Sequence, residues 1–218
     1  MNYTALSQAI QDYTQNTESS FVANIPTFVE QAEQRIYNQI QFPSLRKNVT
    51  GNMTANNKYL SCPSDFLSVF SMAVIDGTGV YYYLLNKDVN FIRAAYPQPT
   101  DSGQPAYYAL FGPQTADPNE LAFILGPTPD SNYQVELHYF YYPTSIVVSG
   151  TSWLGDNFDS VLLYGSLVEA YTYMKGEQDM MALYEGKYKE AVALAKRLGD
   201  GLDRQDAYRS GQVRITVT

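Results

Sequence analysis

The chain has 218 residues, a formal net charge of −8 at pH 7 and 45% hydrophobic residues. This length suits one large domain or a domain with an insertion. The acidic balance excludes the overall basic footprint of a nucleic-acid-binding domain. The single cysteine, Cys62, excludes an intramolecular disulfide and a cysteine-based zinc site.

Two helices are predicted near the N-terminus. The first covers residues 2–14, and the polar stretch that follows ends it. The second covers residues 26–40, with Pro26 in its first turn and Pro43 limiting its end. Its apolar residues recur at the 3.6-residue spacing of a helix and are Phe28, Val29, Ala32, Ile36 and Ile40.

The pattern changes to short strands between residues 45 and 143. Strands are predicted at 59–61, 66–75, 80–85, 106–111, 121–125 and 134–142. Residues 76–79, Asp-Gly-Thr-Gly, predict a hairpin turn because glycine tolerates a positive φ. A short helix is predicted at 88–95, and a loop follows at 97–104.

The helix predicted at 158–174 is apolar on nearly every face, since only Asp159 and Glu169 are charged within it. A surface helix normally confines its apolar residues to one stripe. Two explanations are open: a deep intramolecular core, or one core face and one subunit interface. The second is favoured because a chain of this length is small for a fully enclosed helix. The expected interface residues are Tyr164, Leu167, Tyr171 and Met174.

The boundaries of this helix carry their own signals. Asp156 is a plausible N-cap, with Asp159 three residues later. Lys175 and Gly176 mark the end of the helix, with glycine just past the last turn.

A second helix is predicted at 180–198, packed antiparallel on the first. Its stripe follows a 3-4-3-4-3 spacing and comprises Met181, Tyr184, Tyr188, Ala191, Ala195 and Leu198. After Gly199 and Gly201 the chain is polar and is expected to be irregular.

The order of elements predicts an α+β fold with segregated elements. Helices at both ends form a bundle, and an antiparallel β-rich insertion lies between them. The expected division is a helical domain of residues 1–44 and 144–202, a β-rich domain of 45–143, and an extended C-terminal arm of 203–218.

No catalytic, cofactor or metal site is predicted. His138, the one histidine, lies in an alternating strand without a metal-ligand motif, and a structural position is favoured. A Cys62–His138 nucleophile pair remains open but has no local signature. A catalytic pair of carboxylates also remains open, although scattered loop acids are usually solvated; the acids concerned are Asp117, Glu120, Asp130 and Glu136.

Tyrosines crowd the predicted strands, at residues 81–83, 107–108, 139 and 141–142. Consecutive strand residues point to opposite faces, so both faces of the β region carry aromatic rings. Tyrosine suits a sheet core, a protein interface and a sugar-binding surface alike. Tyr82 and Tyr108 are the expected contacts with a partner protein or, alternatively, with a glycan.

The N-terminal segment lacks the basic and apolar regions of a signal peptide, and no run of about 18 apolar residues occurs. The expectation is a soluble protein without a membrane anchor that is not conventionally exported.

The chain resembles the head-to-tail adaptor proteins of tailed phages. The resemblance rests on the order of helices, β insertion and helical hairpin. Locally it rests on the stretches at residues 153–158 (Trp-Leu-Gly-Asp-Asn-Phe), 184–191 (Tyr-Glu-Gly-Lys-Tyr-Lys-Glu-Ala) and 207–211 (Ala-Tyr-Arg-Ser-Gly).

This resemblance implies a non-enzymatic virion protein without cofactors, in the neck between capsid and tail, and in the host cytoplasm during assembly. It implies a homo-oligomeric ring, a dodecamer, that joins the portal protein to a tail or nozzle protein. Double-stranded DNA would pass through the ring without specific binding. The implied portal-docking residues lie in the C-terminal arm and are Arg204, Tyr208, Arg209, Arg214 and Ile215.

Two other functions remain open. One is a tyrosine-rich glycan-binding module of a tail or surface system, which accounts for the tyrosines but not for the C-terminal hairpin. The other is an enzyme of unknown type, which requires Cys62, His138 or an acid pair to meet in a pocket.

Overall fold

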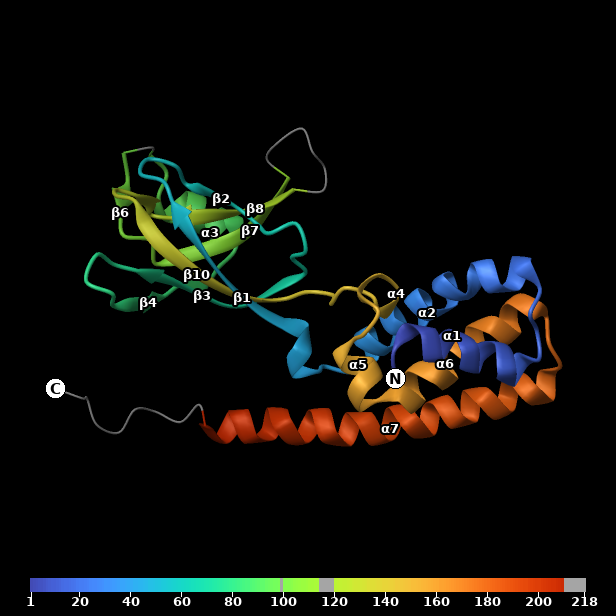
Figure 1. Cartoon of the computed structure of the whole chain (residues 1–218). Helices are drawn as coiled ribbons and strands as arrows, with labels where there is room; N and C mark the ends of the chain where they lie inside the picture. Colours follow the sequence, from blue (N-terminus) through green and yellow to red (C-terminus); the bar gives the residue numbers. More distant parts are fainter. Residues whose placement is uncertain (99, 114–119, 210–218) are drawn as a thin grey trace. The chain divides into compact units, whose positions relative to one another are not determined.

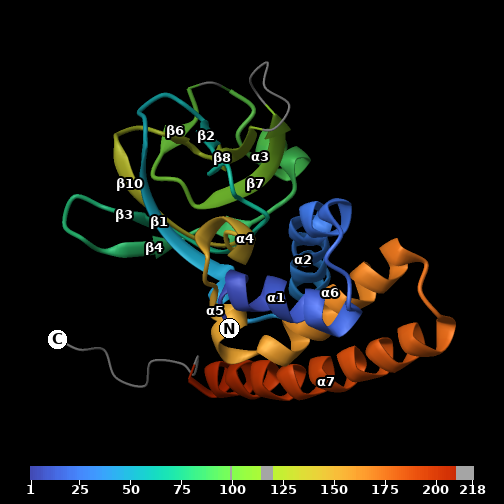
Figure 2. The same cartoon turned by 45° about the vertical axis from the view of Figure 1, so that its right-hand side comes forward.

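The computed structural model describes residues 1–98, 100–113 and 120–209, with the backbone alone for Pro43 and residues 198–209. The chain divides into two compact units, Met1–Leu45 with Tyr142–Thr218, and Arg46–Tyr141 (Figures 1 and 2). The first unit is helical and the second is built on antiparallel strands. The predicted α+β class is therefore confirmed.

Helices make up the whole regular structure of the first unit in the described part of the chain. They are α1 (Tyr3–Thr14), α2 (Ser19–Gln39), the 3-10 helix η1 (Pro43–Leu45), α4 (Ile146–Ser149), α5 (Trp153–Asn157), α6 (Asp159–Met174) and α7 (Gln178–Arg209). Asn2 caps α1 by accepting a 2.9 Å hydrogen bond from the Ala5 amide. Lys175 ends α6 in the left-handed conformation, with a φ of 51°.

Helix α2 begins seven residues before the predicted start at Pro26. Proline lacks an amide donor and costs about 3 kcal/mol inside a helix. Here the helix continues upstream because Phe21 and Ile25 are buried and extend the apolar stripe by two turns. Packing of these side chains offsets the free-energy cost of the proline. Pro26, which was expected in the first turn, therefore lies inside the helix.

Helix α6 lies at the centre of the helical unit, in contact with α1, α2, α5 and α7. Its buried residues cover most of its circumference and are Val161, Leu162, Leu163, Gly165, Ser166, Leu167 and Ala170. A Cβ at Gly165 would lie 3.2 Å from the Tyr188 ring and 3.3 Å from Ala32 Cβ, so glycine permits the close approach of α7 and α2. Most of the apolar pattern thus reflects an intramolecular core, and the half-buried Tyr164, Val168 and Tyr171 leave part of one face accessible.

The start of α6 differs from the prediction. Asp156 lies inside the short helix α5, and Phe158 occupies the N-cap of α6 without a side-chain cap bond. Ser152 caps α5 by accepting a 3.0 Å hydrogen bond from the Gly155 amide. The ring centroids of Phe158 and Phe42 lie 5.2 Å apart. Aromatic packing therefore fixes the junction between α5 and α6, where an aspartate cap was expected.

Two four-stranded sheets form the second unit. The first has the order β1 (Arg46–Met53), β10 (Tyr133–Phe140), β3 (Ser68–Ile75) and β4 (Tyr81–Tyr83), all antiparallel. The second has the order β2 (Tyr59–Ser61), β8 (Leu121–Gly126), β7 (Tyr107–Pro113) and β5 (Leu85–Asn86). The pairs β5–β7 and β6 (Ser102–Gly103) with β9 (Thr128–Pro129) are short and parallel. A short helix, α3 (Val89–Ala95), packs on β7 and β8.

The predicted hairpin turn joins β3 to β4. Asp76 Oδ1 accepts hydrogen bonds from the amides of Thr78 and Val80, at 2.8 and 3.0 Å, and Gly79 adopts a φ of 86°. Strand β1 was not predicted from the sequence, because its residues are mostly polar and its side chains are mostly exposed. It exists because its backbone pairs with β10 along eight residues.

Leu167→Ala should lower the free energy of unfolding by about 2–5 kcal/mol, because Leu167 is 0% exposed at the centre of the helical core. The matched control is Leu194→Ala on α7, where the leucine is 60% exposed and the change should stay within about 0.5 kcal/mol. Chemical denaturation followed by circular dichroism measures both. Equal losses for the two variants would contradict the central placement of α6.

Glu33 is a buried carboxylate, 3% exposed, that accepts a 3.0 Å hydrogen bond from the Ile146 amide at the start of α4. Burial raises the pKa of the Glu33 carboxyl. The stability that protonated Glu33 contributes is therefore fully present below the ordinary pKa and is lost as pH rises through the raised pKa. Glu33→Gln keeps an acceptor oxygen but removes the charge.

The stability of Glu33→Gln relative to the unsubstituted chain should therefore increase as pH rises above about 4, the ordinary pKa of a glutamate carboxyl. Denaturant melts across this range provide the measurement. Glu177→Gln, at an exposed position, is the control and should leave the pH profile unchanged. Parallel profiles for Glu33→Gln and the unsubstituted chain would refute the expected pKa shift.

Candidate functional site

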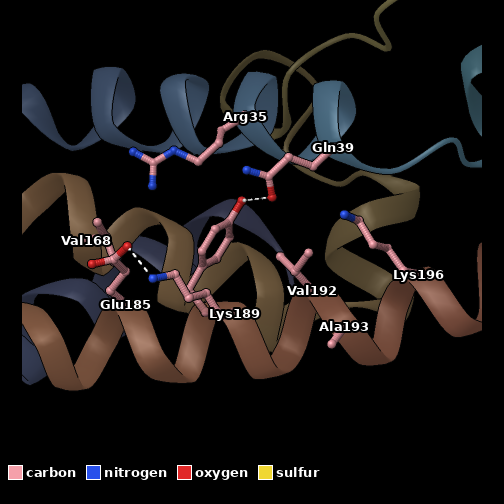
Figure 3. Close-up of a pocket in the computed structure, with 9 residues that line it drawn as sticks. Arg35, Gln39, Val168, Glu185, Lys189, Val192, Ala193 and Lys196 are labelled. Carbon is pink, nitrogen blue, oxygen red and sulfur yellow. Dashed lines mark hydrogen bonds and ion pairs between the residues drawn. The ribbon is translucent and has the colours of Figure 1, made fainter.

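A groove of about 760 Å³ lies between helices α2 and α7 of the helical unit (Figure 3). Helix α2 contributes Arg35 and Gln39, and α6 contributes Val168. The remaining lining residues come from α7 and are Glu185, Tyr188, Lys189, Val192, Ala193 and Lys196. The groove thus combines apolar side chains with charged side chains.

Hydrogen bonds and ion pairs hold the walls of the groove in place. Arg35 forms an ion pair with Glu169 of α6, and its guanidinium lies 5.6 Å from the Tyr188 ring centroid. The Tyr188 hydroxyl donates a 3.3 Å hydrogen bond to Gln39 Oε1, which links α7 to α2 (dashed line in Figure 3). Burial raises the pKa of Tyr188, so this hydroxyl remains a protonated donor.

The charge of the groove is opposite to that of the chain. Its lining has three cationic side chains, Arg35, Lys189 and Lys196, and one carboxylate, Glu185. Lys189 Nζ lies 2.8 Å from Glu185 Oε1, an exposed pair that contributes little stability. Both Arg35 and Lys189 thus have carboxylate partners within the helical unit itself.

This groove was not predicted from the sequence. The signal available was the spacing of Lys189 and Lys196, which are seven residues apart and therefore lie on one face of a helix. Val192 lies between them on the same side, outside the apolar stripe that predicted the helix. The contribution of Arg35 depends on how α2 packs against α7, and sequence spacing does not reveal that.

Helix α7 is twice as long as the helix on which it packs. Its 32 residues span about 48 Å, and the 16 residues of α6 span about 24 Å. The last of its residues described as buried is Ala195, at 0% exposure. Residues 197–209, which we call the overhang, continue the helix beyond the bundle (Figures 1 and 2).

The overhang corrects the prediction of an irregular, extended segment after Gly199 and Gly201. Each glycine costs only about 1 kcal/mol in a helix, and extending an existing helix is easier than starting one. Arg204, Tyr208 and Arg209, expected in the portal-docking arm, therefore have helical backbone. Arg214 and Ile215, the other residues of the expected arm, lie outside the described residues.

The residues expected at a subunit interface differ in burial. Leu167 is 0% exposed within a single chain, so the prediction is wrong for this residue. Tyr164, Tyr171 and Met174 are half-buried, and their placement at an interface stays a prediction. Within the chain, the Tyr171 ring lies 4.9 Å from that of Tyr184.

The two tyrosines expected to contact a tail partner also differ. Tyr82 is 45% exposed on β4, an edge strand, and stays a candidate contact. Tyr108 is 6% exposed and packs 5.8 Å from Phe123 in the core of the β unit, so it is not available as a surface contact. Its neighbours in sequence gave no sign of which tyrosine faces inward, because the whole β region is aromatic.

The residues considered for catalysis have ordinary structural roles. The His138 ring packs 5.2 Å from Phe70, and Cys62 is buried in an apolar core. Glu136 accepts hydrogen bonds from Asn48 and Tyr81, and Asp130 accepts one from Tyr133. Asp117 lies outside the described residues.

Metal-binding clusters and membrane-spanning helices are both absent from the described part of the chain. No cluster of three or more histidine, cysteine, aspartate or glutamate residues that could hold a metal ion occurs there. No helix there has the length and apolar character needed to cross a membrane.

Comparison with known families decides which family the chain is part of. The profile of the family described as SU10 adaptor protein matches residues 1–216. The chain belongs to the SU10 adaptor protein family. This confirms the resemblance to phage head-tail adaptors, and the protein is a structural head-tail adaptor.

Other comparisons add little to the description of this adaptor. No curated protein sequence matches it. One chain from the solved structure "Neck of empty GTA particle computed with C6 symmetry" aligns over 78% of each chain, with 9% identity and a TM-score of 0.27. A similarity this low carries no argument about the fold or the function of the adaptor.

Cys62 should be almost unreactive in the folded adaptor. Burial raises the pKa of its thiol to about 12, and only the thiolate is nucleophilic. With Ellman's reagent at about pH 8, the native thiol should react at least about 100-fold more slowly than the thiol of the unfolded chain. A native rate close to the unfolded rate would contradict the burial of Cys62 and reopen its candidacy as a nucleophile.

Proposed function

We propose that this adaptor assembles into a homo-oligomeric ring, a dodecamer, in the neck of the virion. The observation that carries the proposal is the overhang of α7, which extends past the bundle that its own chain supplies. A cyclic ring needs heterologous contacts, in which one patch meets a different patch on the neighbour. Tyr164, Tyr171 and Met174 keep part of their surface available for such contacts.

The ring joins the portal protein above to a tail or nozzle protein below, after assembly in the host cytoplasm. Residues 203–218 form the portal-docking arm. The first part of this arm leaves the bundle as a helix, which supports a role in reaching another protein. Its docking residues are Arg204, Tyr208, Arg209, Arg214 and Ile215.

The β unit is the proposed region of contact with the tail. Tyr82 lies on the edge strand β4 between two other exposed tyrosines, Tyr81 and Tyr83. Tyrosine is enriched at protein interfaces. Glycan binding, the alternative, has weaker support because one of its two expected contacts, Tyr108, is buried.

DNA passes through the proposed ring without specific contacts. Non-specific binding to DNA depends on cationic contacts with phosphates. A net charge of −8 opposes such contacts and supports free passage.

The purified adaptor should form ring-sized particles, either alone or after purified portal is added, and mass photometry measures them. A chain that ends at Leu202 should keep its fold by circular dichroism but lose binding to the portal. Monomers alone under both conditions would contradict the ring. Unchanged portal binding by the folded, truncated chain would contradict the docking arm.

A further inference from the structure

A second cavity of the helical unit, with a volume of about 170 Å³, lies beside α2. Its lining comes from α2 and from the segment that leads into α4, and includes Glu30, Glu33, Gln34, Tyr37, Tyr142 and Ser145. We call it the acidic cavity, and we propose that it binds a guanidinium group, the cationic head of an arginine side chain. The site is separate from the α2/α7 groove, and the proposal does not depend on the ring.

The carboxylate of Glu33 is the central feature of the acidic cavity. Its side chain is 3% exposed, and Oε1 accepts a 3.0 Å hydrogen bond from the Ile146 amide. The Ser145 side chain also forms a hydrogen bond with this carboxyl group. Both partners are neutral, so the negative charge of Glu33 has hydrogen bonds but no counter-ion among them.

No cationic side chain lines the acidic cavity in the part of the chain that the structure describes. Buried carboxylates are normally paired with a cation, because removing a charge from water is costly. Glu30, one turn before Glu33 on α2, adds a second negative charge at the exposed side of the cavity. Burial raises the pKa of Glu33, and the charge of Glu30 raises it further. A cation that enters the cavity would compensate both carboxylates.

Two aromatic rings form the remaining walls. Tyr37 is 7% exposed and Tyr142 is 38% exposed, and their ring centroids lie 6.4 Å apart. A guanidinium group is planar, stacks on aromatic faces and pairs with carboxylates through a fork of donors. The helical unit already contains this combination once, since Arg35 pairs with Glu169 and lies 5.6 Å from the Tyr188 ring centroid.

The size and the donor set of the cavity favour guanidinium over other cations. A water molecule takes up about 30 Å³ in the liquid, so the cavity has the volume of about five waters, more than a single metal ion fills. In the described residues, no three acidic, histidine or cysteine side chains gather here to hold a metal. A lysine ammonium is a strongly hydrated point charge and gains less from aromatic walls.

Titration of the full chain with N-acetyl-arginine amide tests the proposal. N-acetyl-citrulline amide is the matched control, because it has nearly the same shape and no charge. At about pH 7, above the ordinary pKa of a glutamate carboxyl, the arginine probe should shift the nuclear magnetic resonance signal of the Ile146 amide saturably. The citrulline probe should leave that signal unchanged, and N-acetyl-lysine amide should bind more weakly than the arginine probe.

Variants of the two acids locate the binding. Glu33→Gln keeps an acceptor for the Ile146 amide and should weaken binding of the arginine probe at least about tenfold, because a charge-assisted hydrogen bond is lost. Glu30→Gln, at an exposed position, should weaken it too and is the variant least able to disturb the fold. Glu177→Gln, an exposed acid outside the cavity, should leave binding unchanged. Circular dichroism melts verify folding, and the Tyr37 amide is the second reporter signal.

Absence of saturable binding, or equal binding of the citrulline probe, would overturn the inference. Equal affinity for the lysine probe would overturn the assignment to guanidinium. Binding that persists in both acid variants would overturn its location. None of these results depends on whether the chain forms rings.

Mass photometry then distinguishes the two sources of a guanidinium group. If a protein partner supplies an arginine, Glu30→Gln with Glu33→Gln should reduce ring formation or portal binding, and the arginine probe should compete with it. Unchanged assembly of this folded variant, together with binding of the probe to the unsubstituted chain, would identify a free small molecule as the source.

Discussion

Helix α6 is enclosed by α1, α2 and α7, and the rest of the helical unit depends on this contact. Burying each leucine or valine of α6 contributes about 1.5–3 kcal/mol, and the buried residues point toward all three neighbours. A helix with polar residues on one face could not occupy this place, since their burial would leave them without water. Gly165 allows Tyr188 of α7 and Ala32 of α2 to approach closely.

The close packing around α6 also forms the groove. Helices α2 and α7 both pack on α6, so the groove-lining residues of α2 and α7 face each other across Val168 of α6. The ion pair of Arg35 with Glu169 and the hydrogen bond of Tyr188 with Gln39 then fix the spacing of the walls. The groove is therefore a consequence of how α2 and α7 pack on α6. The greater length of α7 produces the overhang.

The β unit separates its aromatic residues into two roles. Tyr108 and Tyr139 are buried in its core, whereas Tyr81, Tyr82 and Tyr83 lie exposed on the edge strand β4. The exposed Tyr81 donates a hydrogen bond to Glu136, one of the acids for which a catalytic role was left open and not favoured. An edge strand with exposed aromatic rings is a suitable surface for a protein partner.

Hydrophobic periodicity and turn residues are local signals, so the sequence by itself determined the α+β class and most of the helices and strands. The order of these elements and three short sequence stretches also gave the family resemblance. It also identified α6 as exceptional from its apolar residues alone. Only the tertiary structure decided that α6 is covered within one chain, since burial depends on how many other helices reach it. For the same reason Leu167 and Tyr108 changed from expected contacts to core residues. The groove needed both α2 and α7 in place, because Arg35 and Lys189 are far apart in sequence and meet only through packing on α6.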